Sequence, residues 1–294
     1  MSSNTVLYHY CSATAMKDIV ESESIWLTNM SCMSDYREHN WLIHIACEHL
    51  HSLKQSRTNT LGECLLHLFE YVRPQDPFAA CFSEDGDCLS QWRAYADDGT
   101  GVAIGFDPTC LGIHQSPPIA ASKDLTGLCK VNYNAVEQET LVRDTLKKCL
   151  AELPADPQPR EIESVAAACM RELYQWAPSF KNPGFREEKE WRIIHLPFFP
   201  HRLDEIDPTH EQAPSFSTQE FMVRRGRLIP YIALRFRRHK PIKRVIWGPK
   251  CQMEECAATS LFLMHGYQMI NPAPNFIDNF APDVEFARSA TPYR

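Results

Sequence analysis

The sequence of 294 residues has no apolar run long enough to cross a membrane. Its longest apolar stretches, such as Val102 to Phe106 and Val245 to Trp247, are far shorter than the roughly 18–20 residues that a spanning helix needs. The first residues contain no basic patch followed by an apolar segment, so we expect no signal peptide. These two absences predict a cytoplasmic protein that does not use a membrane as a partner.

Motifs of several well-known sites are also missing. No Cys-x-x-Cys pair occurs, and the 12 cysteines are scattered without the spacing of a disulfide framework, so we expect reduced thiols and no metal. No Gly-Lys-Ser/Thr follows the Gly-Thr-Gly at 99–101, and neither Gly-x-Gly-x-x-Gly nor Gly-x-Ser-x-Gly is present. The chain therefore has no P-loop, dinucleotide fingerprint or nucleophile elbow.

The chain has fewer basic than acidic residues, and its formal net charge is -7. Such a balance argues against broad, non-specific attraction to nucleic acid, which depends on neutralising phosphates. Basic residues nevertheless gather between positions 224 and 244. They fit either a phosphate-bearing ligand or the solvated edges of strands.

The order of the predicted elements favours an α+β fold. With 44% hydrophobic and 23% charged residues the chain is an ordinary globular protein, taken here as one domain over 1–294. Short strands alternate irregularly with helices of unequal length, which favours a mixed, mostly antiparallel sheet core with flanking helices over a doubly wound parallel sheet. Two helices at about 135–178 interrupt the strands and are predicted to form a helical insertion. Strands are expected at 5–10, 25–28, 78–83, 102–106, 128–133, 189–195, 221–225, 229–234 and 242–247, and helices from Ser12, at 38–53, 61–72, 88–96, 136–153, 161–176 and 254–264.

The first candidate segment is the strand that contains His9 and Tyr10. Neighbouring side chains of a strand point to opposite faces, so His9 lies opposite Tyr8 and Tyr10. A histidine can hold a ribose hydroxyl or transfer a proton near neutral pH. The same residue also fits a core histidine that is satisfied by backbone groups.

The second segment places Arg93 between Trp92 and Tyr95. Arginine binds phosphate or carboxylate bidentately, and an aromatic ring can stack on a base, so these residues suit a nucleotide. A helix that packs both aromatic rings inward and pairs Arg93 with an acid explains the pattern equally well.

The third segment contains Glu188, Glu190 and Arg192. On a strand these three side chains share one face, with the two carboxylates about 7 Å apart. Their repulsion can raise a pKa or prepare a general base, and Arg192 moderates it. The alternative is an exposed strand edge with alternating charges.

Several separated segments, in this order, resemble the bacterial family catalogued as domain of unknown function 2971. The resemblance covers most of the chain, and its motifs are Leu7-Tyr8-His9-Tyr10, Phe82-Ser83 with the stretch from Ser90 to Tyr95, the stretch from Gly101 to Phe106, Phe185 with the stretch from Glu188 to Arg192, and Trp247-Gly248-Pro249. The family's name itself assigns no activity.

The opening strand and helix also look like the start of ADP-ribosyltransferase-like proteins. That resemblance implies NAD as a substrate, a nucleotide-like ligand, and an acceptor that is a protein or a nucleic acid. His9 would hold the nicotinamide-side ribose, Tyr10 or Tyr95 would stack, and Arg93 would meet the pyrophosphate. Glu190, or alternatively Glu188, would support cleavage of the glycosidic bond. The sequence departs from the better-known transferases because it lacks a clear Ser-Thr-Ser segment.

Three functions therefore compete. The first is an NAD-consuming transferase or glycohydrolase. The second is a non-catalytic module that binds a nucleotide or a nucleic-acid end through Arg93, Arg224 and Arg225, with stacking on Trp92 or Tyr95. The third is a protein-interaction domain whose charged segments are only surface.

Overall fold

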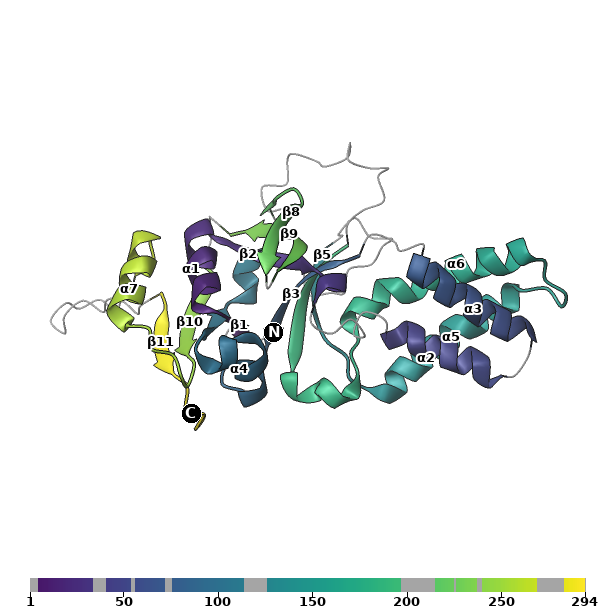
Figure 1. The fold of residues 1–294 in the computed structure, drawn as a ribbon, viewed down its shortest axis with the longest axis horizontal. Helices are drawn as coiled ribbons and strands as arrows, with labels where there is room; N and C mark the ends of the chain where they lie inside the picture. The colour runs from purple at the N-terminus through teal and green to yellow at the C-terminus, as the bar shows by residue number, and fades with distance from the viewer. Residues whose placement is uncertain are drawn as a thin grey trace.

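The computed structural model describes residues 5–33, 41–53, 56–71, 76–113, 126–196, 215–224, 226–236, 240–268 and 283–293. Within these ranges the chain forms a mixed α+β fold built on an 11-stranded sheet (Figure 1). Every named strand pair is antiparallel except β10 with β11, which confirms the predicted fold class. The strands are β1 Leu7–Cys11, β2 Ser24–Asn29, β3 Phe78–Ser83, β4 Val102–Phe106, β5 Thr126–Lys130, β6 Glu190–His195, β7 Ser215–Phe216, β8 Glu220–Arg224, β9 Arg227–Arg235, β10 Ile242–Trp247 and β11 Glu285–Arg288.

Helices cover both faces of the part of the sheet around β4. The α-helices are α1 Ala13–Ser22, α2 Trp41–Ser52, α3 Ser56–Tyr71, α4 Leu89–Tyr95, α5 Ala135–Glu152, α6 Pro159–Trp176 and α7 Glu255–Met264. Val102 and Ile104 of β4 belong to the core that also contains residues of α1 and α7. Ala103, which points the other way, packs with Trp92 of α4. All five residues of β4 are buried, as expected for a strand with both faces covered.

The N-terminus of α1 follows from its first residues. Ser12 has extended backbone angles, and its hydroxyl accepts a hydrogen bond from the Ala15 amide at 3.0 Å, as predicted for the N-cap. Met16, Ile19 and Val20 then lie buried on one face at helical spacing. The helix connects β1 to β2 and holds both strands against the core.

The predicted helical insertion is part of a larger bundle. Helices α5 and α6 pack with α2 and α3 around a second hydrophobic core, at the end of the molecule away from α7 (Figure 1). Hydrophobic faces on all four helices require this partnership, because a helix pair alone would leave one side of each face in water. Among the described residues, we find no helix with the length and apolar character required to span a bilayer.

The central feature of the sheet is a fork at β3. Strand β1 pairs with one edge of β3 only where Tyr8 lies opposite Ser83, whereas β2 pairs with the same edge at Ala79 and Phe78. Extending both registers would place a residue of β1 and a residue of β2 at the same position opposite Cys81. One strand edge takes one neighbour at a time, so β1 and β2 diverge there, and an opening lies between them.

Candidate functional site

A cleft with a volume of about 270 Å³ lies at this fork. It is lined by Tyr8, His9 and Tyr10 of β1, by Trp26 and Thr28 of β2, and by residues 79–82 of β3. These are the residues that border the divergence of the two strands. The cleft is therefore a consequence of the sheet's topology.

His9 connects β1 to β3 inside the cleft. Its Nδ1 lies 2.8 Å from the carbonyl oxygen of Cys81, and because a carbonyl only accepts, Nδ1 carries the proton. Burial lowers the pKa of His9, the charge of Arg224 lowers it further, and the bond to the Cys81 carbonyl opposes both effects. His9 is thus neutral near pH 7, and its Nε2 is the ring atom that can accept a hydrogen bond from a ligand hydroxyl.

Glu188 and Glu190 line the same cleft, but they reach it from different elements. Glu188 ends the 3₁₀ helix η5 Pro183–Glu188, Lys189 has a left-handed φ of 46°, and Glu190 starts β6. The expectation that Glu188 and Glu190 share one strand face is wrong, because the turn at Lys189 separates them. The Ser83 hydroxyl donates to the Glu188 carbonyl at 2.7 Å and fixes this turn against β3.

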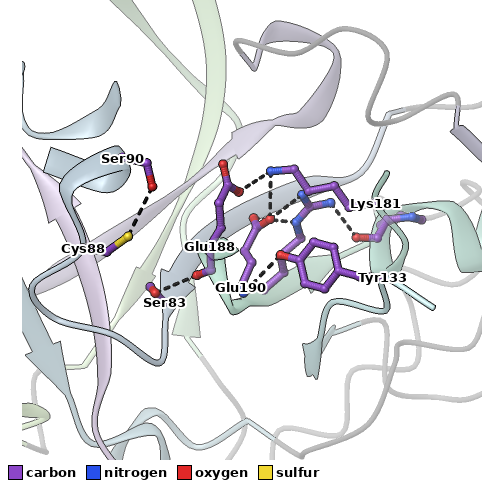
Figure 2. Close-up of polar contacts among 9 residues, drawn as sticks. Ser83, Cys88, Ser90, Tyr133, Lys181, Glu188 and Glu190 are labelled. Carbon is purple, nitrogen blue, oxygen red and sulfur yellow. Dashed lines mark hydrogen bonds and ion pairs between the residues drawn. The ribbon is translucent and has the colours of Figure 1, made fainter. Parts of the chain in front are cut away.

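Lys181 joins the two carboxylates. Its Nζ lies 2.5 Å from Glu188 Oε2 and 3.2 Å from Glu190 Oε2, and its side chain is 1% exposed (Figure 2). The repulsion predicted between the two glutamates is therefore offset by a buried cation between them. The sequence carries no signal for this role, since Lys181 belongs to no predicted element.

Arg192 holds Glu190 on its other side. Its Nε donates to Glu190 Oε1 at 2.7 Å and its Nη2 to Oε2 at 2.8 Å, while Nη1 donates to the Pro178 carbonyl at 2.9 Å. Burial alone would raise the pKa of Glu190, but Arg192 and then Lys181 outweigh it and lower this pKa to about 2. The predicted rise of a pKa is therefore wrong for Glu190. Arg192 is fully buried and is not among the residues that line the cleft.

The segment with Trp92, Arg93 and Tyr95 divides between core and surface. Trp92 is fully buried and donates its Nε1–H to Asp87 Oδ1 at 2.7 Å, so it does not present a ring to a ligand. Arg93 is exposed on α4, where its charge acts on Asp98, and it is not among the residues that line the cleft. Tyr95 is half-buried and does line it. The helix interpretation with Trp92 packed inward is the one that the structure supports.

Tyr10 has a mixed position. It lines the cleft, but it is 6% exposed and packs edge-on against Trp92 with ring centroids 4.8 Å apart. Its hydroxyl donates to the Asp85 carbonyl at 2.8 Å and accepts from the Cys88 amide at 2.9 Å. Tyr10 therefore shapes the wall of the cleft and holds the loop before α4.

The cleft's remaining charges come from the basic region of the sequence. Arg224 at the end of β8 and Arg227 at the start of β9 both line it, whereas Arg225, Arg237 and Arg238 lie outside the described residues. The alternation of residues along a hairpin explains why these two arginines face the cleft together. No cluster of three or more metal-ligating side chains occurs within the described ranges.

The middle of the chain matches one protein family. Residues 91–193 match the family described as Protein of unknown function (DUF2971). The match contains Lys181, Glu188 and Glu190 and leaves out His9 and the β8–β9 hairpin, so it is narrower than the resemblance seen in the sequence. No curated protein and no solved structure matches the chain.

Proposed function

We propose that the cleft binds a nucleotide-like ligand, NAD in the first instance, and that the protein cleaves the bond between ribose and nicotinamide, as an ADP-ribosyltransferase-like enzyme or a glycohydrolase. The observation that carries the proposal is the meeting of His9, Tyr95, Glu188 and Glu190 around one opening, although three distant segments supply them. The resemblance of the first strand and helix to ADP-ribosyltransferase-like proteins is an analogy of pattern, and the chemistry rests on the residues themselves.

The lining suits a ring joined to a sugar. The rings of Tyr8, Trp26 and Tyr95 offer faces or edges for stacking, and Nε2 of His9 accepts from a ribose hydroxyl. A volume of about 270 Å³ is close to the lower end of the ~300–1,000 Å³ of small-molecule sites, so the cleft accommodates part of a dinucleotide.

Glu188 is the better placed of the two carboxylates for catalysis. Glu190 is bound by Arg192 through both oxygens, and a carboxylate so neutralised is a weak base and a weak partner for a developing cation. The Glu188 side chain is 12% exposed against 7% for Glu190, and Lys181 holds its carboxylate. Glu188 therefore takes the role that the sequence resemblance gave first to Glu190.

In the reaction, the bond between the anomeric carbon and the nicotinamide nitrogen breaks, and its electron pair leaves with the now neutral nicotinamide. Positive charge develops on the ribose, where the Glu188 carboxylate stabilises it. Water, or a hydroxyl or other nucleophile of an acceptor protein or nucleic acid, forms the new bond to that carbon. The nucleophile's proton passes to Glu188 or to solvent.

The test is release of nicotinamide from NAD, measured by chromatography with water alone and with a panel of protein and nucleic-acid acceptors. Glu188→Gln should lower kcat by about a hundredfold or more, because a positioned carboxylate contributes that much. Lys181 keeps Glu190 as a partner in this variant. Glu187→Gln is the matched control, since Glu187 is the exposed neighbour, and it should behave as the wild type. Absence of turnover and of any NAD-induced rise in Tm would refute the proposal.

A second candidate is a module that binds a nucleotide without cleaving it. Two hydrogen bonds from Arg192 to Glu190, and the low pKa of Glu190 that results, favour this second candidate, because the carboxylates then serve to fix the wall of the cleft. This candidate predicts an NAD-induced rise in Tm that persists in Glu188→Gln, with no nicotinamide released. Binding that disappears in Glu188→Gln together with turnover would count against it.

A further inference from the structure

The β8–β9 hairpin has one face directed into the cleft. In its antiparallel register Met222 lies opposite Ile229, and Arg224 opposite Arg227. All four line the cleft. The intervening side chains of Phe221, Val223 and Leu228 point the other way and are 58%, 75% and 64% exposed. The hairpin is therefore a two-stranded wall whose inner face carries two arginines at its tip.

These two guanidinium groups lack an opposite charge within the described part of the chain. No ion pair or hydrogen bond to a described residue is made by either side chain, and Glu220, the acid of the same hairpin, accepts from the Tyr231 hydroxyl at 2.9 Å. Directly opposite residues of an antiparallel pair have Cβ atoms about 5 Å apart, and like charges placed so repel each other. An anion between the two side chains would remove this repulsion.

Arg224 also acts on the interior of the cleft. Its positive charge contributes to the lowered pKa of His9, although burial is the larger cause. Arg224 and His9 also line the same cleft, so one ligand bound there can contact both. A ligand that contacts His9 through a ribose would carry its attached phosphates toward the hairpin tip.

Phosphate is the anion that fits this pair best. A guanidinium offers a planar fork that matches two phosphate oxygens, and two such forks match adjacent phosphates of a pyrophosphate. Glu188 and Glu190 line the same cleft from other elements, and their carboxylates suit the sugar, where positive charge develops. The cationic side chains of the hairpin therefore suit the phosphates.

We propose that Arg224 and Arg227 form an anion subsite that binds the pyrophosphate of the nucleotide, a role that the sequence had assigned to Arg93. The subsite rests on the proposed function for the identity of its ligand. It makes the two arginines the residues that distinguish a dinucleotide from a free nucleoside.

The experiment compares three probes by isothermal titration calorimetry: ADP-ribose, inorganic pyrophosphate and nicotinamide riboside. Nicotinamide riboside is the one probe of the three that carries no phosphate. Arg224→Gln and Arg227→Gln should each weaken ADP-ribose and pyrophosphate binding by about tenfold or more, since each removes a charge-assisted contact. Binding of nicotinamide riboside should stay unchanged. Arg224→Lys should give an intermediate loss, because it retains the charge without the fork. Arg93→Gln is the matched control and should equal the wild type.

The outcomes separate this subsite from the proposed cleavage. Pyrophosphate binding that depends on Arg224 and Arg227, without release of nicotinamide from NAD, would support the subsite and refute the enzyme. If Arg224→Gln and Arg227→Gln still release nicotinamide from NAD and still bind ADP-ribose as the wild type does, the subsite is overturned and the proposed cleavage is not. A wild-type protein that binds neither phosphate-bearing probe would overturn it as well. Circular dichroism should show equal folding, since both arginines are exposed.

Discussion

Glu190→Gln tests the buried charge network beside the cleft. Glu190, Lys181 and Arg192 have side-chain exposures of 7%, 1% and 0%, and one carboxylate contacts both cations. The variant retains the shape of the side chain but removes its charge. Lys181 then keeps its ion pair with Glu188, whereas Arg192 loses the negative charge of Glu190. Breaking a buried ion pair in this way costs about 3–5 kcal/mol.

The lowered pKa leads to a similar magnitude. A carboxyl group whose pKa falls from 4.5 to about 2 on folding stabilises the protein above pH 4.5 by about 3 kcal/mol. This contribution is lost as the pH falls from 4.5 toward 2, because in this range the unfolded state binds a proton that the folded state does not bind. The difference in stability between the wild type and Glu190→Gln should therefore be largest near pH 7 and decrease below pH 4.5.

Urea unfolding followed by circular dichroism, at pH 7 and at steps down to pH 3, measures this difference. Glu187→Gln should match the wild type at each pH, since its side chain is exposed. A double variant, Glu190→Leu with Arg192→Met, should be more stable than Glu190→Gln, because it removes both charges of the pair together. A loss below about 1 kcal/mol at pH 7, or a loss that does not change with pH, would show that the network contributes little.

Three other changes probe the core and the cleft. Trp92→Phe should lower the free energy of unfolding by about 1–3 kcal/mol, because it leaves the half-buried Asp87 carboxylate without its indole donor, and should not change ligand affinity. Tyr95→Leu should weaken ligand binding and leave the free energy of unfolding nearly unchanged; calorimetry and urea unfolding check both variants. Burial lowers the pKa of His195 to about 4, so stability should decrease as the pH falls from 6.5 toward 4, and His195→Asn should flatten this slope by up to about 1.4 kcal/mol for each pH unit in urea titrations. A Cβ at Gly101 would overlap a backbone carbonyl of β1, so Gly101→Ala should lower Tm, whereas Gly62→Ala, in a helix, should leave it unchanged or raise it.

Local patterns predicted most of the elements. The strands Phe78–Ser83, Val102–Phe106 and Ile242–Trp247 have the bounds that the sequence indicated. The first two are mostly apolar runs bordered by turn residues, and the third is rich in β-branched and aromatic residues. β11 was missed. Its four residues alternate weakly, and it forms only because β10 offers an edge that is distant in sequence.

The candidate site was predicted in part, and the failures have a common cause. A strand pattern reveals which residues alternate, so His9 and Glu190 were found. It does not reveal which charges meet across the fold, so it gave no sign that Lys181 joins the two glutamates or that Arg227, unlike Arg93, lines the cleft. The sequence also could not show that Trp92 is buried and Tyr95 half-buried, because a buried and an exposed aromatic residue look alike on a seven-residue helix.

The fork at β3 also decides when a newly made chain can acquire its cleft. β3 is synthesised early, but its other edge waits for β6, whose Glu190 pairs with Ser83, and the inner wall of the opening waits for the hairpin at Arg227. A chain still attached to the ribosome and ending within α6 has the cleft residues of β1, β2 and β3 but lacks those of β6 and of the β8–β9 hairpin. A ligand that needs all of them can bind only after the hairpin has left the exit tunnel, so it stabilises the finished protein and leaves unfinished chains unaffected.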